Sequence, residues 1–192
     1  FQPPSVTTET YAYAPEEAAF YEMMTEFITT GKTYASTLGT ADARTATLVI
    51  ITLQKLASSS IAAVRSALER RLDRLRQTTS VYRDLDRLRE LLELEGDGNE
   101  DELRNLEEML TGYALGVTLM EDEQARIEEL LQAASRVRRE TKIERIVDLV
   151  ASRFDGRSVL FFTEYKATQS LLMTRLRSEF GADSTTFING DE

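Results

Sequence analysis

The segment 141–192 reads TKIERIVDLVASRFDGRSVLFFTEYKATQSLLMTRLRSEFGADSTTFINGDE, and it alternates helix-like and strand-like patterns. Its run SVLFF (158–162) is continuously apolar, as in a parallel strand covered on both faces. A helix with Leu172 and Leu176 on one side follows, ends near Gly181 and precedes a second strand-like run, STTFI (184–188). A helix between two parallel strands is a βαβ unit, which needs further strands to form a sheet. The segment therefore predicts an α/β lobe that this chain begins and does not finish.

The chain before this segment favours long helices, because no proline follows Pro15. Apolar periodicity predicts a helix that starts at Pro15 and stops near Gly31, and a second helix over 41–57. Ser58–Ser60 provide an N-cap for a third, long helix. The predicted fold class is therefore mainly α, with a C-terminal partial α/β (βαβ) unit.

Two further elements complete the predicted organisation. The run SVTTETYAY (5–13) predicts one short strand before Pro15. The loop Gly96–Asn99 divides the third helix from later helices, one of them over about 127–137, and this arrangement predicts an antiparallel helical hairpin.

Charge is distributed in blocks within a chain of net charge -10. Residues 55–89 hold nine Lys or Arg against four Asp or Glu, whereas residues 90–131 hold two against fourteen. Neighbouring blocks of opposite sign favour two helices that pair through complementary flanks. The alternative is a nucleic-acid footprint on the basic block, with Arg65, Arg70, Arg71 and Arg74 as candidate contacts to a duplex.

Residue types restrict the chemistry that the chain can perform. Cys and His are both absent, so thiolate metal sites, a Cys nucleophile and the usual neutral-pH general base are excluded. No phosphate loop of the GxxxxGK[ST] type, no GxGxxG and no GxSxG occurs. Adjacent acids such as Glu107–Glu108 and Glu128–Glu129 point apart on a helix and indicate solvated faces. We expect no catalytic residues and no cofactor in this chain, and the lack of a long apolar run or signal peptide favours a cytoplasmic protein.

The loop TEYKAT (163–168) is the best candidate for ligand contact, because ligands bind at the carboxyl ends of strands in open α/β sheets. Thr163, Tyr165, Lys166 and Thr168 offer hydroxyl groups and one cation beside a helix N-terminus, which suits a phosphate. The alternative is an ordinary N-cap with an exposed Lys166.

Two stretches resemble Swi/Snf-related, DEAD/DEAH-box ATP-dependent helicases. The run from Thr141 to Gly181, with VLFFTEY in it, is similar to the start of the second RecA-like motor lobe of that family. LQKLASSSIAAVRSALERRL (53–72) is similar to the segment that bridges the two lobes, although Ser60 replaces a Pro that the family often has. The resemblance covers about 60 residues in the order that the family shows.

The resemblance implies a fragment of an ATP-dependent DNA translocase. Residues 1–14 would hold the last strand of the first lobe, 15–140 the helical inter-lobe region, and 141–192 the incomplete second lobe. ATP and Mg²⁺ would bind to parts of the parent protein outside this chain, and the partner would be nucleic acid, most simply double-stranded DNA. Thr163 and its neighbours would face the phosphates of the tracked strand, and Gly190 would match a family glycine that follows the next strand. Two other hypotheses remain open: a helical adaptor that binds a protein partner, and a small carboxylate-based enzyme.

Overall fold

The structure is a computed structural model, and it describes residues 6–76, 117–154 and 156–188. The elements in these ranges are α1 (Pro15–Ala35), α2 (Thr40–Ser59), α3 (Ile61–Arg76), α6 (Glu123–Arg136), α7 (Thr141–Arg153), α8 (Lys166–Phe180) and the short 3₁₀ helix η1 (Ala182–Ser184). The predicted loop Gly96–Asn99 lies outside the described residues. None of the helices in the described ranges is long and apolar enough to cross a lipid bilayer.

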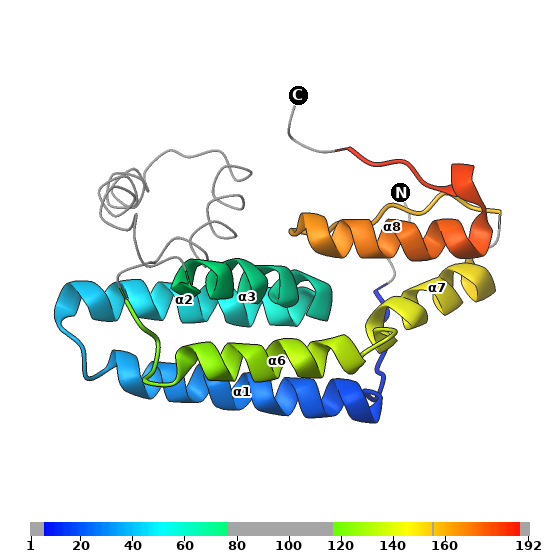
Figure 1. The fold of residues 1–192 in the computed structure, drawn as a ribbon. Coiled ribbons are helices and arrows are strands. Elements are labelled where there is room, and N and C mark those ends of the chain that lie inside the picture. The colour runs from blue at the N-terminus through cyan, green and yellow to red at the C-terminus, as the bar shows by residue number, and fades with distance from the viewer. Residues whose placement is uncertain (1–5, 77–116, 155, 189–192) are drawn as a thin grey trace.

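Four helices, α1, α2, α3 and α6, form an antiparallel bundle (Figure 1). Within the bundle each helix packs against two others, in the order α1, α2, α3, α6 and back to α1. On α1 the apolar stripe Phe20, Met24 and Phe27 repeats at steps of four and three, so these side chains share one face and are fully buried. Leu53 and Leu68 contribute equally buried side chains from α2 and α3.

Helix boundaries follow the predicted signals with one correction. Pro15 starts α1, and the hydroxyl of Ser60 accepts a hydrogen bond from the Ala63 amide at 3.0 Å, so the N-cap prediction for α3 is confirmed. The predicted stop at Gly31 is wrong, because α1 continues to Ala35. Gly31 faces the core, where a Cβ would lie 3.1 Å from Ile50 Cδ1, so the glycine allows α1 and α2 to approach closely within a continuous helix.

A smaller pair of helices, α7 and α8, lies at one end of the bundle (Figure 1). Its core consists of Ile143, Val147, Leu172 and Leu176. The predicted stop of α8 at Gly181 is confirmed, since this glycine follows Phe180 with a φ of 102° that other residues rarely adopt.

The predicted βαβ unit is wrong, because no residue of the described ranges forms a strand. Residues 158–162 and 185–188 lie as non-helical, largely exposed chain on either side of α8, and residues 6–13 likewise form no strand. Leu160 and Phe162 are 75% and 90% exposed instead of covered. A strand needs a neighbour to pair with its amides and carbonyls, and the described residues supply no such neighbour. The described chain is therefore helical rather than partly α/β.

Candidate functional site

A polar joint connects the bundle to the α7–α8 pair, and Glu140 lies at its centre. The Glu140 carboxylate accepts hydrogen bonds from the amides of Ile61 and Ala62, each at 2.9 Å. These are the first two amides of α3, so the side chain satisfies groups that have no partner within the helix and places negative charge at its N-terminus. Burial raises the pKa of the Glu140 carboxyl above its ordinary value, although the two backbone hydrogen bonds act in the opposite direction.

Hydroxyl groups extend the joint from α3 to α8. Thr168 Oγ1 lies 2.8 Å from Ser59 Oγ and 2.7 Å from Ser60 Oγ, and both Ser60 and Thr168 are buried. Lys142 Nζ donates to the carbonyls of Ser58 at 3.2 Å and Ser59 at 3.1 Å, where a cation complements the C-terminus of α2. Residues far apart in the sequence thereby meet around one helix junction.

Glu17 connects α1 to the start of α7 in the same joint. This residue is 1% exposed, and its carboxylate accepts hydrogen bonds from the Ala14 amide at 3.0 Å and the Thr141 amide at 2.8 Å, as well as from the Thr141 hydroxyl. Tyr21 lies close by, and its pKa is raised, first by burial and then by Tyr13 and Glu140. We define the polar joint as the set Glu17, Ser59, Ser60, Glu140, Lys142 and Thr168.

The polar joint is a structural element, because its hydrogen bonds are satisfied internally. Among the described residues, no buried side-chain nitrogen or oxygen lacks a hydrogen-bond partner. Sequence reasoning assigned neither acid to a candidate site. Glu17 was recognisable as a third-position acid of the helix that starts at Pro15, whereas Glu140 caps a helix 79 positions away and carries no local signal.

The predicted phosphate loop does not form one exposed site. Tyr165 and Thr168 are buried, at 2% and 6% exposure, and the Thr168 hydroxyl is hydrogen-bonded to the hydroxyls of Ser59 and Ser60. Thr163 is half-buried and makes a long contact of 3.5 Å with the Tyr165 amide, while Lys166 is exposed at the first position of α8. Gly190 lies outside the described residues.

The four candidate arginines of α3 also do not form one exposed surface. Arg71 is 2% exposed, and its guanidinium pairs with the equally buried Glu123 and donates to the Val117 carbonyl at 3.0 Å. Arg65 pairs along its own helix with Glu69 at 2.8 Å, and Arg70 is exposed while Arg74 is half-buried.

Pairing between the charged blocks is present where the structure describes both of them. Arg71 pairs with Glu123, and Arg76 Nη2 lies 2.8 Å from Glu128 Oε1. Both ion pairs join the basic helix α3 to the acidic helix α6. The geometry therefore favours the interpretation of complementary helix flanks over that of a footprint formed by all four arginines.

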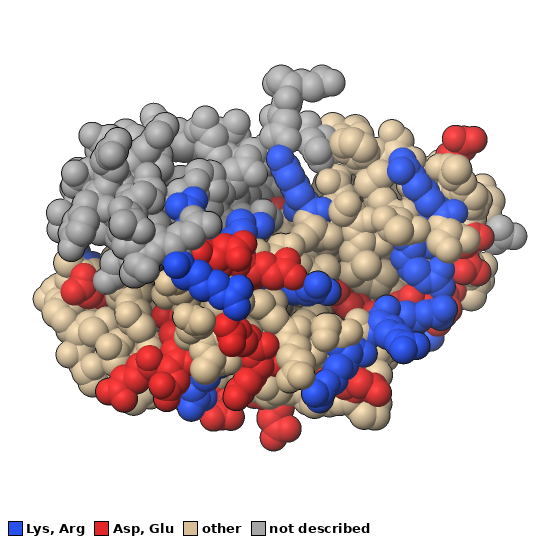
Figure 2. Space-filling view, viewed as in Figure 1, with Lys and Arg blue, Asp and Glu red and all other residues tan. Residues whose placement is uncertain are grey.

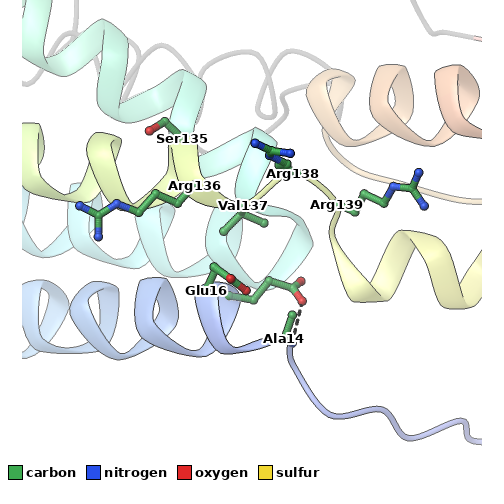
Figure 3. A pocket seen from close by; sticks show the side chains of 8 residues that line it. Ala14, Glu16, Ser135, Arg136, Val137, Arg138 and Arg139 are labelled. Atoms are coloured by element: carbon green, nitrogen blue, oxygen red, sulfur yellow. Dashed lines mark hydrogen bonds between the residues drawn. The ribbon is translucent and has the colours of Figure 1, made fainter.

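A second basic feature, which the sequence analysis did not select, comprises the last residue of α6 and the turn that leads to α7. We define the arginine turn as residues 136–139, in which Arg136, Arg138 and Arg139 are all exposed. The turn borders a shallow cleft lined on its other side by Ala14, Glu16 and Glu17 (Figure 3). The signal was present as the sequence RVRR, but this short group lies just beyond the acidic block and was not counted with either block.

Within the described ranges, no group of three or more acidic side chains is arranged to hold a metal ion. No protein-family model, curated protein or solved structure matches the chain.

Proposed function

We propose that this chain is a non-catalytic helical part of a Swi/Snf-like ATP-dependent DNA helicase or translocase. The observation that carries the proposal is the meeting of the two stretches that resemble the family. Ser59 and Ser60, from the stretch 53–72, form hydrogen bonds with Thr168, from the stretch 141–181, across more than one hundred positions of sequence. Two independently similar stretches that pack into one joint are expected when both belong to the same functional unit.

The proposed work of the chain is mechanical. ATP and Mg²⁺ would bind to other parts of the parent protein, and closure of its two motor lobes would move a phosphate-tracking surface along DNA. The four-helix bundle gives a rigid body, and the polar joint fixes the α7–α8 pair to it through hydrogen bonds to helix ends. Such a unit transmits a change in lobe angle without absorbing it, in a protein that we place in the cytoplasm.

The parent reading frame provides the first test. It should encode a GKT-type phosphate loop before the sequence of this chain and an arginine-bearing helicase motif after it. A reading frame without these two motifs would contradict the motor proposal. The purified chain should itself show no ATP hydrolysis, with or without DNA.

The joint itself provides a second test. In the parent protein, Thr168→Val removes the hydroxyl that both serines contact while it retains the side-chain shape. We expect reduced coupling, measured as base pairs moved per ATP hydrolysed, with DNA affinity unchanged. Thr174→Val, an exposed threonine on the same helix, is the matched control.

An adaptor that binds a protein partner is the second candidate. Exposure of large apolar side chains in the non-helical segments favours it, since Leu160, Phe162 and Ile188 are 75%, 90% and 92% exposed. The reading frame separates the two candidates, because an adaptor needs neither of the two ATPase motifs.

A further inference from the structure

We infer that the arginine turn, residues 136–139, is the surface through which this chain contacts the phosphate backbone of nucleic acid. The inference rests on the proposed function and deepens it by naming the contact. It replaces the arginines of α3, of which Arg71 is buried in an ion pair within the protein.

The first argument is the local balance of charge. The chain carries a net charge of -10, yet residues 136–180 hold ten Lys or Arg against six Asp or Glu. Figure 2 shows Lys and Arg gathered on the part of the surface that α7 and α8 form, and Asp and Glu gathered over the bundle. On the face that Figure 2 shows, an anionic polymer is therefore repelled from the bundle and attracted to the end that α7 and α8 form.

The second argument is that neighbouring cations already have partners, whereas the turn is exposed. Arg145 and Arg153 both pair with Glu9, at 3.2 Å and 2.7 Å, and Arg175 pairs with Glu144 at 2.7 Å. In the part of the chain that the structure describes, Arg136 and Arg138 take part in no ion pair. Arg139 has only a long contact of 3.8 Å with Glu144.

The third argument is the direction of the side chains. The guanidinium groups of Arg136, Arg138 and Arg139 point away from one another, and those of Arg138 and Arg139 lie on the side of the turn away from Glu16 (Figure 3). A single small anion requires donors that converge on it. Diverging cations instead suit a polymer whose successive phosphates follow one another along a strand.

A membrane surface fits the turn less well. Peripheral binding to lipid combines cations with apolar side chains that enter the bilayer. The apolar residue of the turn, Val137, is half-buried and packs against the bundle core. The turn therefore offers charge without an apolar group to insert.

The experiment measures fluorescence anisotropy of a short, fluorescein-labelled DNA duplex titrated with the chain at several salt concentrations. The test variant is Arg136→Glu/Arg138→Glu. The matched control is Lys32→Glu/Arg44→Glu, which makes the same change in net charge with exposed residues at the opposite end of the bundle. Thermal unfolding by circular dichroism verifies that both variants fold.

We expect the turn variant to lose at least about tenfold in affinity and to reduce the salt slope by about two, because two phosphate contacts are removed. The control should stay within about threefold of the unchanged protein. A variant with Arg136→Gln/Arg138→Gln should lose affinity less steeply, and it tests the same contact without added repulsion.

Other outcomes separate the inference from the proposed function. Duplex binding that the turn variant and the control weaken equally would overturn the inference while it leaves the proposed function in place. Absence of duplex binding by the unchanged chain would count against both. Tighter binding to vesicles that contain phosphatidylserine, or to polyglutamate, than to the duplex would overturn the assignment to nucleic acid.

Discussion

The bundle and the α7–α8 pair differ in how much of each is stabilised by a buried core. The bundle buries large side chains such as Phe20, Ile50 and Leu68 completely, and it also buries an ion pair. The core of the pair holds four buried residues, and the non-helical chain beside it exposes Leu160 and Phe162. The smaller unit has the smaller core of its own, and we expect its position to depend on contacts with the bundle, which include the polar joint and the burial of Tyr165 in the bundle core.

Among the polar contacts of the protein, loss of the buried ion pair should have the largest effect on stability. We expect Arg71→Ala to lower the free energy of unfolding by about 3–5 kcal/mol, because it leaves the Glu123 carboxylate buried without its cation. Chemical denaturation followed by circular dichroism measures this change.

Arg76→Ala is the matched control, on the same helix. Its side chain and that of Glu128 are about half exposed, so water replaces the lost contact and stability should change little. Equal losses in the two variants would show that burial of the Arg71 pair contributes nothing to the fold.

Truncation of a core side chain should lower the free energy of unfolding by different amounts in the two regions. Leu68→Ala in the bundle should cost about 2–5 kcal/mol, because the surrounding helices cannot close the cavity. Leu176→Ala, in the α7–α8 pair, should cost clearly less, since its core is small and lies next to exposed chain that can adjust. The measurement is again denaturant unfolding, and a larger loss for Leu176→Ala would reverse the comparison.

Removal of the central carboxylate of the polar joint should affect position more than total stability. Glu140→Ala leaves the amides of Ile61 and Ala62 without acceptors, and we expect a cost of about 1–2 kcal/mol, as for other helix caps. Hydrogen exchange should become faster in α7 and α8 and stay unchanged in the centre of α1. Uniformly faster exchange across the bundle would contradict the proposed role of the joint.

The dependence of stability on pH should differ in sign between two acids of this region. Burial raises the folded-state pKa of Glu140 above 4.5, so its stabilising contribution is fully present below that value and is lost as pH rises through the folded-state pKa. The hydrogen bond from Arg175 lowers the pKa of Glu144, so its contribution is present above 4.5 and is lost as pH falls through the folded-state pKa.

Two variants test this difference in sign. Relative to the unchanged protein, Glu140→Gln should gain stability as pH rises from about 4 to about 7, whereas Glu144→Gln should lose it. Thermal unfolding across this range measures both differences. Parallel pH curves for the two variants would contradict the assigned environments.

The sequence predicted the helices of the bundle well, although not their arrangement, because the signals that define a helix are local. Pro15, the serines before Ile61 and the spacing of Phe20, Met24 and Phe27 each act within a few residues of the helix that they define. The stop at Gly31 failed because a contact with Ile50, on another helix, decides the use of that glycine.

The remaining features depend on contacts that no local pattern contains. The run SVLFF has the composition of a buried strand, but a strand forms only where another strand pairs with it, and none does in the described residues. The Thr168 hydroxyl was suited to bind a phosphate, but in the structure it forms hydrogen bonds with Ser59 and Ser60, at the end of α2. In the sequence, Arg71 is one of several arginines that predict a cationic helix face. In the structure it is buried in an ion pair with Glu123.

The smallest effect is expected in the exposed segment, where Phe162→Ser removes a large apolar side chain that is 90% exposed. Because folding buries little of this ring, the substitution should change the free energy of unfolding by less than about 0.5 kcal/mol. Phe27→Ser, in the bundle, makes the same chemical change at 2% exposure and should be strongly destabilising, since it removes core contacts and buries a hydroxyl. Denaturant unfolding compares the two. A marked loss for Phe162→Ser would mean that residues 158–162 pack against the protein in solution, and the exposed apolar surface that favours the adaptor would then not exist.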